Sequence, residues 1–200
     1  LQCVQEERDW QALYALIRES TGRRFVLLSR GIPPACLMAF QYAGMMTVLH
    51  AEELLFDRED IRRLLQAHGT EATDSEISAI LRETSGYPLG AAIIARHMAA
   101  GQPYGAELTA QVYGEVFRYF ETAVYHRFDL PIRRFLLELS PFERFDLELA
   151  RIVSGDNNAA ALLDTLWRST TMLRSSDMRS FHFWPQFRQF LLWELEREYT

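Results

Sequence analysis

Three consecutive residues, Gly86, Tyr87 and Pro88, have the types and spacing to shape one wall of a ligand site. Glycine just past a helix end accepts the left-handed backbone conformation that other residues resist. Proline suits the first turn of the next helix, because the N–H that it lacks would have no partner there. The motif therefore predicts a rigid corner between two helices. Taken alone, this corner is either a structural turn or a surface that packs against a bound nucleotide.

Arg30 is a second candidate, and its place in the chain points to phosphate binding. It closely follows residues 25–28 (Phe-Val-Leu-Leu), a continuous apolar run typical of a strand buried in a parallel sheet. In open α/β sheets, ligands bind beyond the carboxyl ends of the strands. An arginine at that edge can neutralise a phosphate group. The alternative is a surface arginine in a loop.

Other residue types that often do chemistry lack the required spacing. Two pairs of carboxylates, at 52–53 and at 57 and 60, are explained by helix capping and by a solvated helix face. No nucleophile motif or glycine-rich loop occurs in the sequence. We therefore expect no catalytic residue and no metal ligand in this chain. The histidines are scattered without metal-ligand spacing: His50, His68, His97, His126 and His182.

The composition narrows the class of protein. The 200 residues are 48% hydrophobic and 24% charged, as in ordinary globular proteins, and the net charge of −6 argues against nonspecific binding of nucleic acid. All 21 basic residues are arginine, so the lysine of a Walker A loop is absent and the chain alone should not hydrolyse ATP. No run is long enough to span a membrane, and no signal peptide is visible. Two isolated cysteines, Cys3 and Cys36, suit a reducing cytoplasm.

The predicted fold class is mainly α with a small β component, in three parts. Residues 1–56 are expected to be the last part of an α/β domain, a remnant of a parallel sheet. Residues 57–104 form a helical lid subdomain that carries the corner. Residues 105–200 form a linker helix and a winged-helix domain, because three helices, a hairpin and a closing helix follow in that order.

The individual elements follow from apolar periodicity and from capping residues. Asp57 and Thr73 are the expected N-caps of two helices. The expected strands are residues 25–28, 46–49, 170–174 and 180–184. The expected helices are residues 6–20, 58–67, 73–84, 89–100, 107–127, 131–139, 146–153, 158–168 and 185–198.

Four segments resemble the STAND-class signalling ATPases, and in particular the large ATP-dependent LuxR-type transcription regulators of the MalT family. Residues 25–34 (FVLLSRGIPP) resemble their sensor strand, which ends in Ser-Arg and is soon followed by proline. Residues 46–57 (MTVLHAEELLFD) resemble the segment that comes next. Residues 83–91 (ETSGYPLGA) are similar to the Gly-x-Pro motif, and residues 130–198 resemble the winged helix.

This resemblance implies roles for the candidate residues. Arg30 would be the sensor arginine that faces the terminal phosphate, and Gly86, Tyr87 and Pro88 would pack beside the adenine. The family usually has a histidine immediately before the proline of its closing segment. Here Trp184 holds that position, and the nearest histidine is His182. ATP or ADP would be the cofactor of the full-length parent, with none bound tightly by this chain alone.

The predicted function is that of a fragment of an ATP-dependent transcriptional regulator. Its sensor strand, helical lid and winged helix would gate nucleotide-dependent oligomerisation in the cytoplasm. The expected partners are the remainder of its own nucleotide-binding domain and, on activation, further copies, with no DNA contact through this chain. The Walker segments would precede Leu1, which is not a methionine. The alternatives are a stand-alone winged-helix DNA-binding protein and a protein-interaction module.

Overall fold

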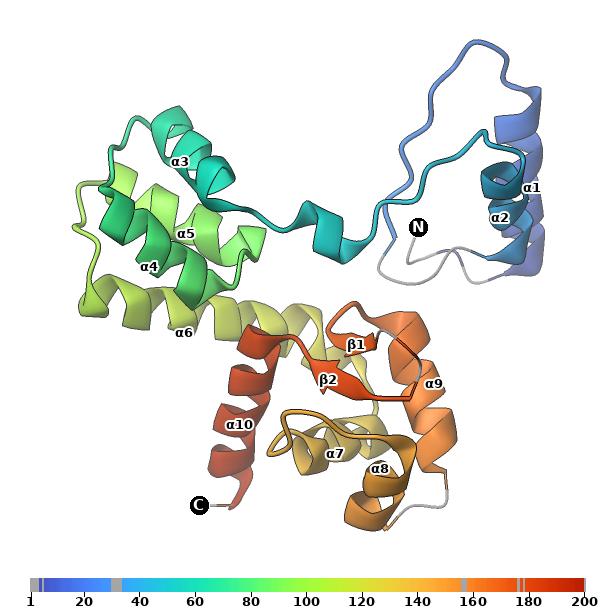
Figure 1. The fold of residues 1–200 in the computed structure, drawn as a ribbon. Helices are drawn as coiled ribbons and strands as arrows, with labels where there is room; N and C mark the ends of the chain where they lie inside the picture. Colours follow the sequence, from blue (N-terminus) through green and yellow to red (C-terminus); the bar gives the residue numbers. More distant parts are fainter. Residues whose placement is uncertain are drawn as a thin grey trace.

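The computed structural model describes residues 6–29, 34–155, 158–175 and 179–199, together with positions 4 and 177. These residues are mainly helical, with one two-stranded antiparallel sheet near the C-terminus. Figure 1 shows a pair of helices at the N-terminal end, a group of helices in the middle and a C-terminal unit that contains the sheet. The middle and C-terminal parts share one hydrophobic core, whereas the N-terminal pair lies apart from them.

The N-terminal pair consists of α1 (Glu7–Glu19) and α2 (Ala35–Tyr42). The rings of Tyr14 and Phe40 join the two helices, with centroids 4.9 Å apart. Leu37 and Phe40 are the buried residues of α2, whereas every residue of α1 is at least partly exposed. The periodicity of the sequence predicts α1 correctly and misses α2, whose apolar residues are not confined to one face.

The apolar runs on either side of α2 do not form the predicted strands. Residues 25–28 and 46–49 have no regular secondary structure. Val26 is 85% exposed and Leu28 is 77% exposed, the opposite of strand burial in a parallel sheet. Such a run becomes a strand only when neighbouring strands and covering helices bury it, and no described residues supply them. The expected remnant of a parallel sheet is therefore not formed in the described part of the chain.

The helical subdomain begins after a short 3-10 helix, η1 (Ala51–Leu54), and contains α3 (Arg58–Ala67), α4 (Asp74–Thr84) and α5 (Pro88–Ala99). Both predicted N-caps are confirmed. The Asp57 carboxylate accepts hydrogen bonds from the backbone N–H groups of Glu59 and Asp60. The Thr73 hydroxyl oxygen accepts one from the N–H of Glu76, whose carboxylate reaches back to Thr73. Each cap satisfies backbone donors that the first helical turn leaves without a partner.

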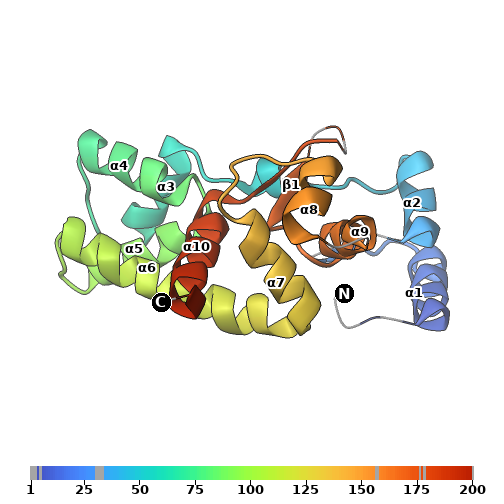
Figure 2. The ribbon, with the colours of Figure 1, turned by 90° about the horizontal axis from the view of Figure 1, so that it is seen from below.

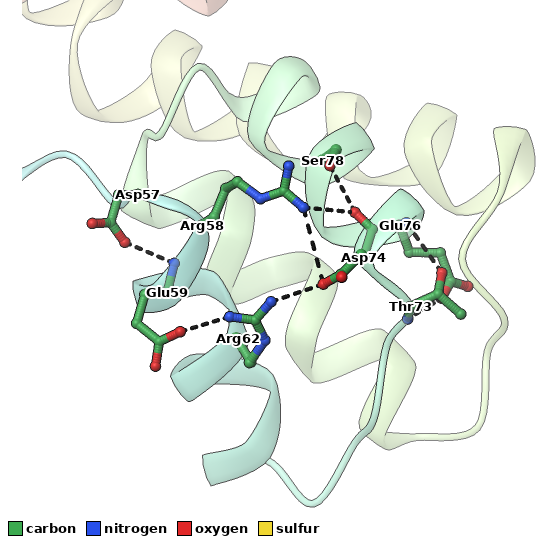
Figure 3. Close-up of polar contacts among 8 residues, drawn as sticks. All are labelled: Asp57, Arg58, Glu59, Arg62, Thr73, Asp74, Glu76 and Ser78. Atoms are coloured by element: carbon green, nitrogen blue, oxygen red, sulfur yellow. Dashed lines mark hydrogen bonds and ion pairs between the residues drawn. The ribbon is translucent and has the colours of Figure 1, made fainter.

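Polar contacts hold the start of α4 against α3. Figure 3 shows Arg62 between two carboxylates, with nitrogen–oxygen distances of 2.6 Å to Glu59 and 2.8 Å to Asp74. Arg58 also donates to the backbone carbonyl of Asp74. These contacts are exposed and contribute little each, so the subdomain depends mainly on its core. That core includes Ile61, Leu65, Ile77, Ile80 and Ile94.

One long helix, α6 (Ala106–Ala123), connects the subdomain to the C-terminal unit, and Figures 1 and 2 both show it passing alongside the two. Residues at four-residue spacing form its buried stripe, which ends in Phe120. The predicted helix over residues 107–127 is interrupted after Ala123, and the 3-10 helix η2 (Tyr125–Arg127) completes it.

The C-terminal unit has the element order of a winged helix. Three helices, α7 (Leu130–Leu139), α8 (Leu147–Ser154) and α9 (Ala159–Ser169), precede β1 (Leu173–Ser175) and β2 (Phe181–Phe183), and α10 (Pro185–Tyr199) closes the unit. The two strands are antiparallel, and Phe145 adds an isolated bridge to Phe181. Fully buried aromatic and aliphatic side chains fill the unit: Phe135, Leu136, Leu166, Phe187, Phe190 and Leu191. The predicted hairpin and winged helix are both confirmed.

Candidate functional site

The predicted corner between α4 and α5 is present and is held by its own backbone. Ser85 ends α4 in the left-handed conformation with φ 49°, and Gly86 follows with φ 73°. The N–H of Tyr87 donates to the carbonyl of Thr84 at 2.8 Å, and Pro88 is the first residue of α5. The chain thus passes from the end of α4 to the start of α5 within three residues, Ser85, Gly86 and Tyr87.

The corner is fixed against the segment that leads into α3. The N–H of Phe56 donates to the carbonyl of Gly86 at 2.8 Å. A Cβ atom at position 86 would lie 2.6 Å from the carbonyl oxygen of Phe56, which is closer than van der Waals contact permits. Glycine is needed at this position for two reasons, its positive φ and this close approach. The residues just before α3 therefore lie directly beside the Tyr87–Pro88 turn.

The winged helix docks onto the same corner. The Trp184 indole N–H donates to Gln186 Oε1 at 2.6 Å, and Gln186 Nε2 donates to the backbone carbonyl of Glu83 at 2.9 Å. The rings of Tyr87 and Trp184 are also in contact, with centroids 5.6 Å apart. Because Glu83 lies in the last turn of α4, Gln186 satisfies a carbonyl that the helix end leaves free. These contacts tie the hairpin and the start of α10 to the corner.

A cavity of about 230 Å³ lies between the corner, η1 and the winged helix. Its lining is almost entirely apolar and includes two aromatic rings, those of Tyr87 and Trp184. This volume is below the roughly 300 to 1,000 Å³ of pockets that enclose a drug-sized ligand. It therefore suits one flat ring system rather than a whole nucleotide. The lining residues are Ala51, Leu54, Leu55, Tyr87, Pro88, Leu89, Thr171, Met172 and Trp184.

The hairpin presents two basic residues on the face that carries Trp184. Arg174 and His182 are directly paired in the register of β1 and β2, so they lie on the same face of the sheet. The alternation of strand residues places Trp184 on this face as well, and opposite the buried Phe181 and Phe183. The apolar cavity thus continues into a basic surface along a single hairpin.

Arg174 is the more enclosed of these two residues. Its guanidinium carbon lies 4.8 Å from the centroid of the Trp184 ring, a cation–π arrangement. One terminal nitrogen pairs with the carboxylate of Glu52 in η1. The other, Nη1, is buried and has no hydrogen-bond acceptor among the described residues. Burial also lowers the pKa of this guanidinium below its ordinary value.

His182 is partly buried, and its surroundings favour the neutral ring. Burial is the main cause that lowers its pKa, and the positive charges of Arg144 and Arg174 lower it further. The ring does not line the cavity. The structure therefore places the predicted site residues in two groups, with the corner at the cavity and His182 beside it on the hairpin.

Sequence reasoning gave Arg174 no role in a ligand site and assigned Glu52 to helix capping or a solvated helix face. It treated Trp184 only as a substitution for the family's histidine. The signal that could have found Arg174 is the alternation of apolar and basic residues along the two strands, which puts it on the face of Trp184. Arg30 lies outside the described residues, so its predicted contact with a phosphate stays a prediction.

The arrangement favours binding rather than covalent chemistry. The cavity lining offers aromatic and aliphatic contacts and no nucleophile beside a base. Within the described ranges, no group of three or more histidine, cysteine or acidic side chains could hold a metal ion. A flat heterocycle could stack on the aromatic rings, and the neighbouring arginine could meet an attached anionic group.

Comparison with known proteins finds a similarity for the C-terminal unit. Residues 121–200 match the family model of the MalT winged helix domain. The match begins in the last turn of α6 and continues through the hairpin and α10, so it includes Arg174, His182 and Trp184. The corner at Gly86 lies outside it. A search of curated proteins found no match to the chain.

The part of the chain that matches this family model therefore supplies one side of the cavity, and residues 51–89 supply the other. Arg168 in α9, the third helix of this unit, pairs with Asp164 on the same helix, with a nitrogen–oxygen distance of 2.9 Å.

None of the helices in the described residues combines the length and apolarity needed to cross a membrane.

Proposed function

We propose that this chain is part of an ATP-dependent transcriptional regulator of the STAND class, related to MalT, in which the winged helix closes over the adenine of a bound nucleotide. The observation that carries the proposal is the cavity shared by the Tyr87–Pro88 turn and the MalT winged helix. Stacking on an aromatic ring contributes about 1 to 3 kcal/mol per base. The cavity thus accounts for weak binding of the base, while tight binding requires phosphate contacts supplied elsewhere.

The phosphate-binding part of the site belongs, in this proposal, to the remainder of the nucleotide-binding domain. Support comes from the apolar side chains that this chain leaves exposed, since Val26, Leu28 and Leu49 all face solvent. A sheet partner that packed on residues 25–28 and 46–49 would bury them and allow the predicted strands to form. Arg30 would then lie at the end of the sensor strand, as the resemblance implies.

The docking contacts of the winged helix suggest how the nucleotide would gate oligomerisation. One hydrogen bond, from Gln186 to the carbonyl of Glu83, and one ring contact, between Trp184 and Tyr87, hold the hairpin on the corner, and the bond from Trp184 to Gln186 orients the Gln186 side chain. Movement of the winged helix away from the corner would break this set of contacts and open the cavity. We propose that this movement exposes the surface on which activated copies of the regulator assemble.

Titration of the 200-residue chain with adenosine tests the nucleotide assignment. The chain has four tryptophans, so NMR of the indole N–H groups gives one resonance for each, and Trp184→Phe assigns its own. We expect millimolar adenosine to shift the Trp184 resonance and to leave that of Trp193, on the last helix, in place. Pro88→Ala should weaken the shift, because it removes part of the cavity wall.

Two results would count against this proposal. Equal shifts of all four tryptophan resonances, or no shift at any adenosine concentration, would contradict binding of the base in the cavity. ATP hydrolysis by the purified chain at a substantial rate would contradict the assignment of the phosphate site to other residues. In a longer protein that responds to ATP, Arg30→Ala should impair the response more than the folding, and an unchanged response would remove Arg30 from the site.

A further inference from the structure

Arg174 has an environment that differs from that of Arg179 on the same hairpin. Its side chain is only 12% exposed, although arginine is rarely buried unless its charge is fully paired. Nη1 has no acceptor among the described residues, so part of its hydrogen-bonding capacity is unused. By contrast, Arg179 lies in the turn of the hairpin and is exposed. A buried guanidinium with an unpaired nitrogen is costly, and a second anionic group beside it would remove that cost.

The present partner of Arg174 comes from the opposite wall of the cavity. Glu52 lies in η1 between Ala51 and Leu54, two residues that line the cavity. Its carboxylate pairs with Arg174, while its side chain remains 58% exposed. The pair therefore bridges η1 and the winged helix at the edge of the cavity. An exposed carboxylate in this position can swing into solvent at little cost when another anion takes its place.

We propose that Arg174 binds the anionic group of a ligand whose flat ring occupies the cavity, and that Glu52 occupies this anion position when the ligand is absent. The ligand class is a heterocycle that carries a phosphate, and the inference rests on the proposed nucleotide function. The ring occupies the cavity and packs against the side chains of Tyr87 and Trp184, which contact each other in its wall. The phosphate displaces the Glu52 carboxylate and forms charge-assisted hydrogen bonds with the guanidinium.

Arg174 suits this role better than its neighbour on the hairpin. It contacts the ring of Trp184, which lines the cavity, and so lies directly beside the bound heterocycle. A planar guanidinium offers paired donors that match phosphate oxygens. His182, its register partner, is held toward its neutral form by burial and by two arginines, and therefore supplies little positive charge.

Titrating the chain separately with adenosine and with ADP tests this inference, again by the Trp184 indole resonance. ADP should bind about tenfold more tightly than adenosine, because one charge-assisted hydrogen bond contributes about that factor. Arg174→Gln should reduce the affinity for ADP to that for adenosine, and Arg174→Lys should restore part of it. Glu52→Gln should raise the affinity for ADP about threefold, since it removes the competing carboxylate, and should leave adenosine unchanged. Arg179→Gln is the matched control and should change neither affinity.

The outcomes of these titrations separate the role of Arg174 from the proposed nucleotide function. If neither compound shifts Trp184, the proposed nucleotide function fails and the role of Arg174 fails with it. If both bind but Arg174→Gln leaves their ratio unchanged, only the role of Arg174 is overturned. If Arg174→Gln does not fold, Glu52→Gln decides the matter, because an unchanged affinity for ADP in that variant contradicts the competition between carboxylate and phosphate.

Discussion

Gly86→Ala tests the close packing of the corner, and its effect can be worked out from two features of the structure. The first is the backbone conformation, since φ at Gly86 is 73°. A residue with a Cβ atom in this left-handed region costs roughly 1 to 2 kcal/mol. The second is the contact with Phe56, whose carbonyl oxygen would lie 2.6 Å from the new Cβ.

The two effects add, because the steric overlap is with backbone that cannot rotate away. Relieving it requires Phe56 to move, which weakens the 2.8 Å hydrogen bond between its N–H and the carbonyl of Gly86. Overpacking of this kind costs typically about 1 to 3 kcal/mol. We therefore expect Gly86→Ala to lower the free energy of unfolding by about 3 kcal/mol.

Gly69→Ala is the matched control, because Gly69 has nearly the same φ, 71°, and a Cβ atom there would lie in open space, with no described atom within 4 Å. Gly69→Ala should lower the free energy of unfolding only by the cost of the left-handed backbone conformation, about 1 kcal/mol. Urea unfolding followed by circular dichroism measures both variants. With a slope of about 2 kcal/mol per molar urea, their midpoints should differ by about 1 M. Equal midpoints would refute the close contact between Gly86 and Phe56.

Three further substitutions test other contacts. Thr73→Ala removes the N-cap of α4 and should lower the free energy of unfolding by about 1 kcal/mol in urea unfolding. Gln186→Ala leaves the buried Trp184 indole N–H without its acceptor and removes the hydrogen bond to the carbonyl of Glu83. It should cost about 2 kcal/mol, so a change below about 0.5 kcal/mol would contradict these two contacts. The hydrogen bond with His97, followed by that with Arg96, lowers the pKa of Glu115 below its ordinary 4.5. The stability that Glu115 adds is therefore present above this pH and is lost as the pH falls through the lowered pKa. Glu115→Gln should flatten the acid limb of stability against pH, whereas an unchanged limb would show that the carboxylate adds none.

The sequence predicts well those features that depend on neighbouring residues. The caps at Asp57 and Thr73 and the Gly86 corner each require only a few consecutive residue types, and all three form as expected. The winged helix also follows from local periodicity and from the turn residues of its hairpin. In these segments, local preference and tertiary packing favour the same structure.

Two predictions that are wrong are the strands at residues 25–28 and 46–49, which depend on residues distant in the sequence. Residues 25–28 have the composition of a buried strand, but a strand needs neighbours that the described residues do not provide. Residues 46–49 fail for the same reason. Composition predicts what such a segment prefers, and only the surrounding residues decide whether it can bury its side chains.

The polar side of the candidate site was equally hard to predict. Arg174 is part of the candidate site for two reasons. The strand register pairs it with His182, and its guanidinium pairs with the carboxylate of Glu52, far earlier in the chain. His182 attracted attention because it lies close to the position of a family histidine. The structure places it on the same face of the hairpin as Arg174, and neither residue is part of the cavity lining. The spacing of residues along the chain could not show that Arg174 contacts the ring of Trp184 and pairs with Glu52.

We have proposed that the corner and the winged helix together hold the base of a nucleotide. Intermolecular nuclear Overhauser effects between adenosine and the chain test this most directly, because they report only contacts at close range. We expect effects from the protons of the adenine ring to both Pro88 and Trp184, one from each wall of the cavity. Effects confined to residues of α9, or to one wall alone, would contradict the proposed binding site.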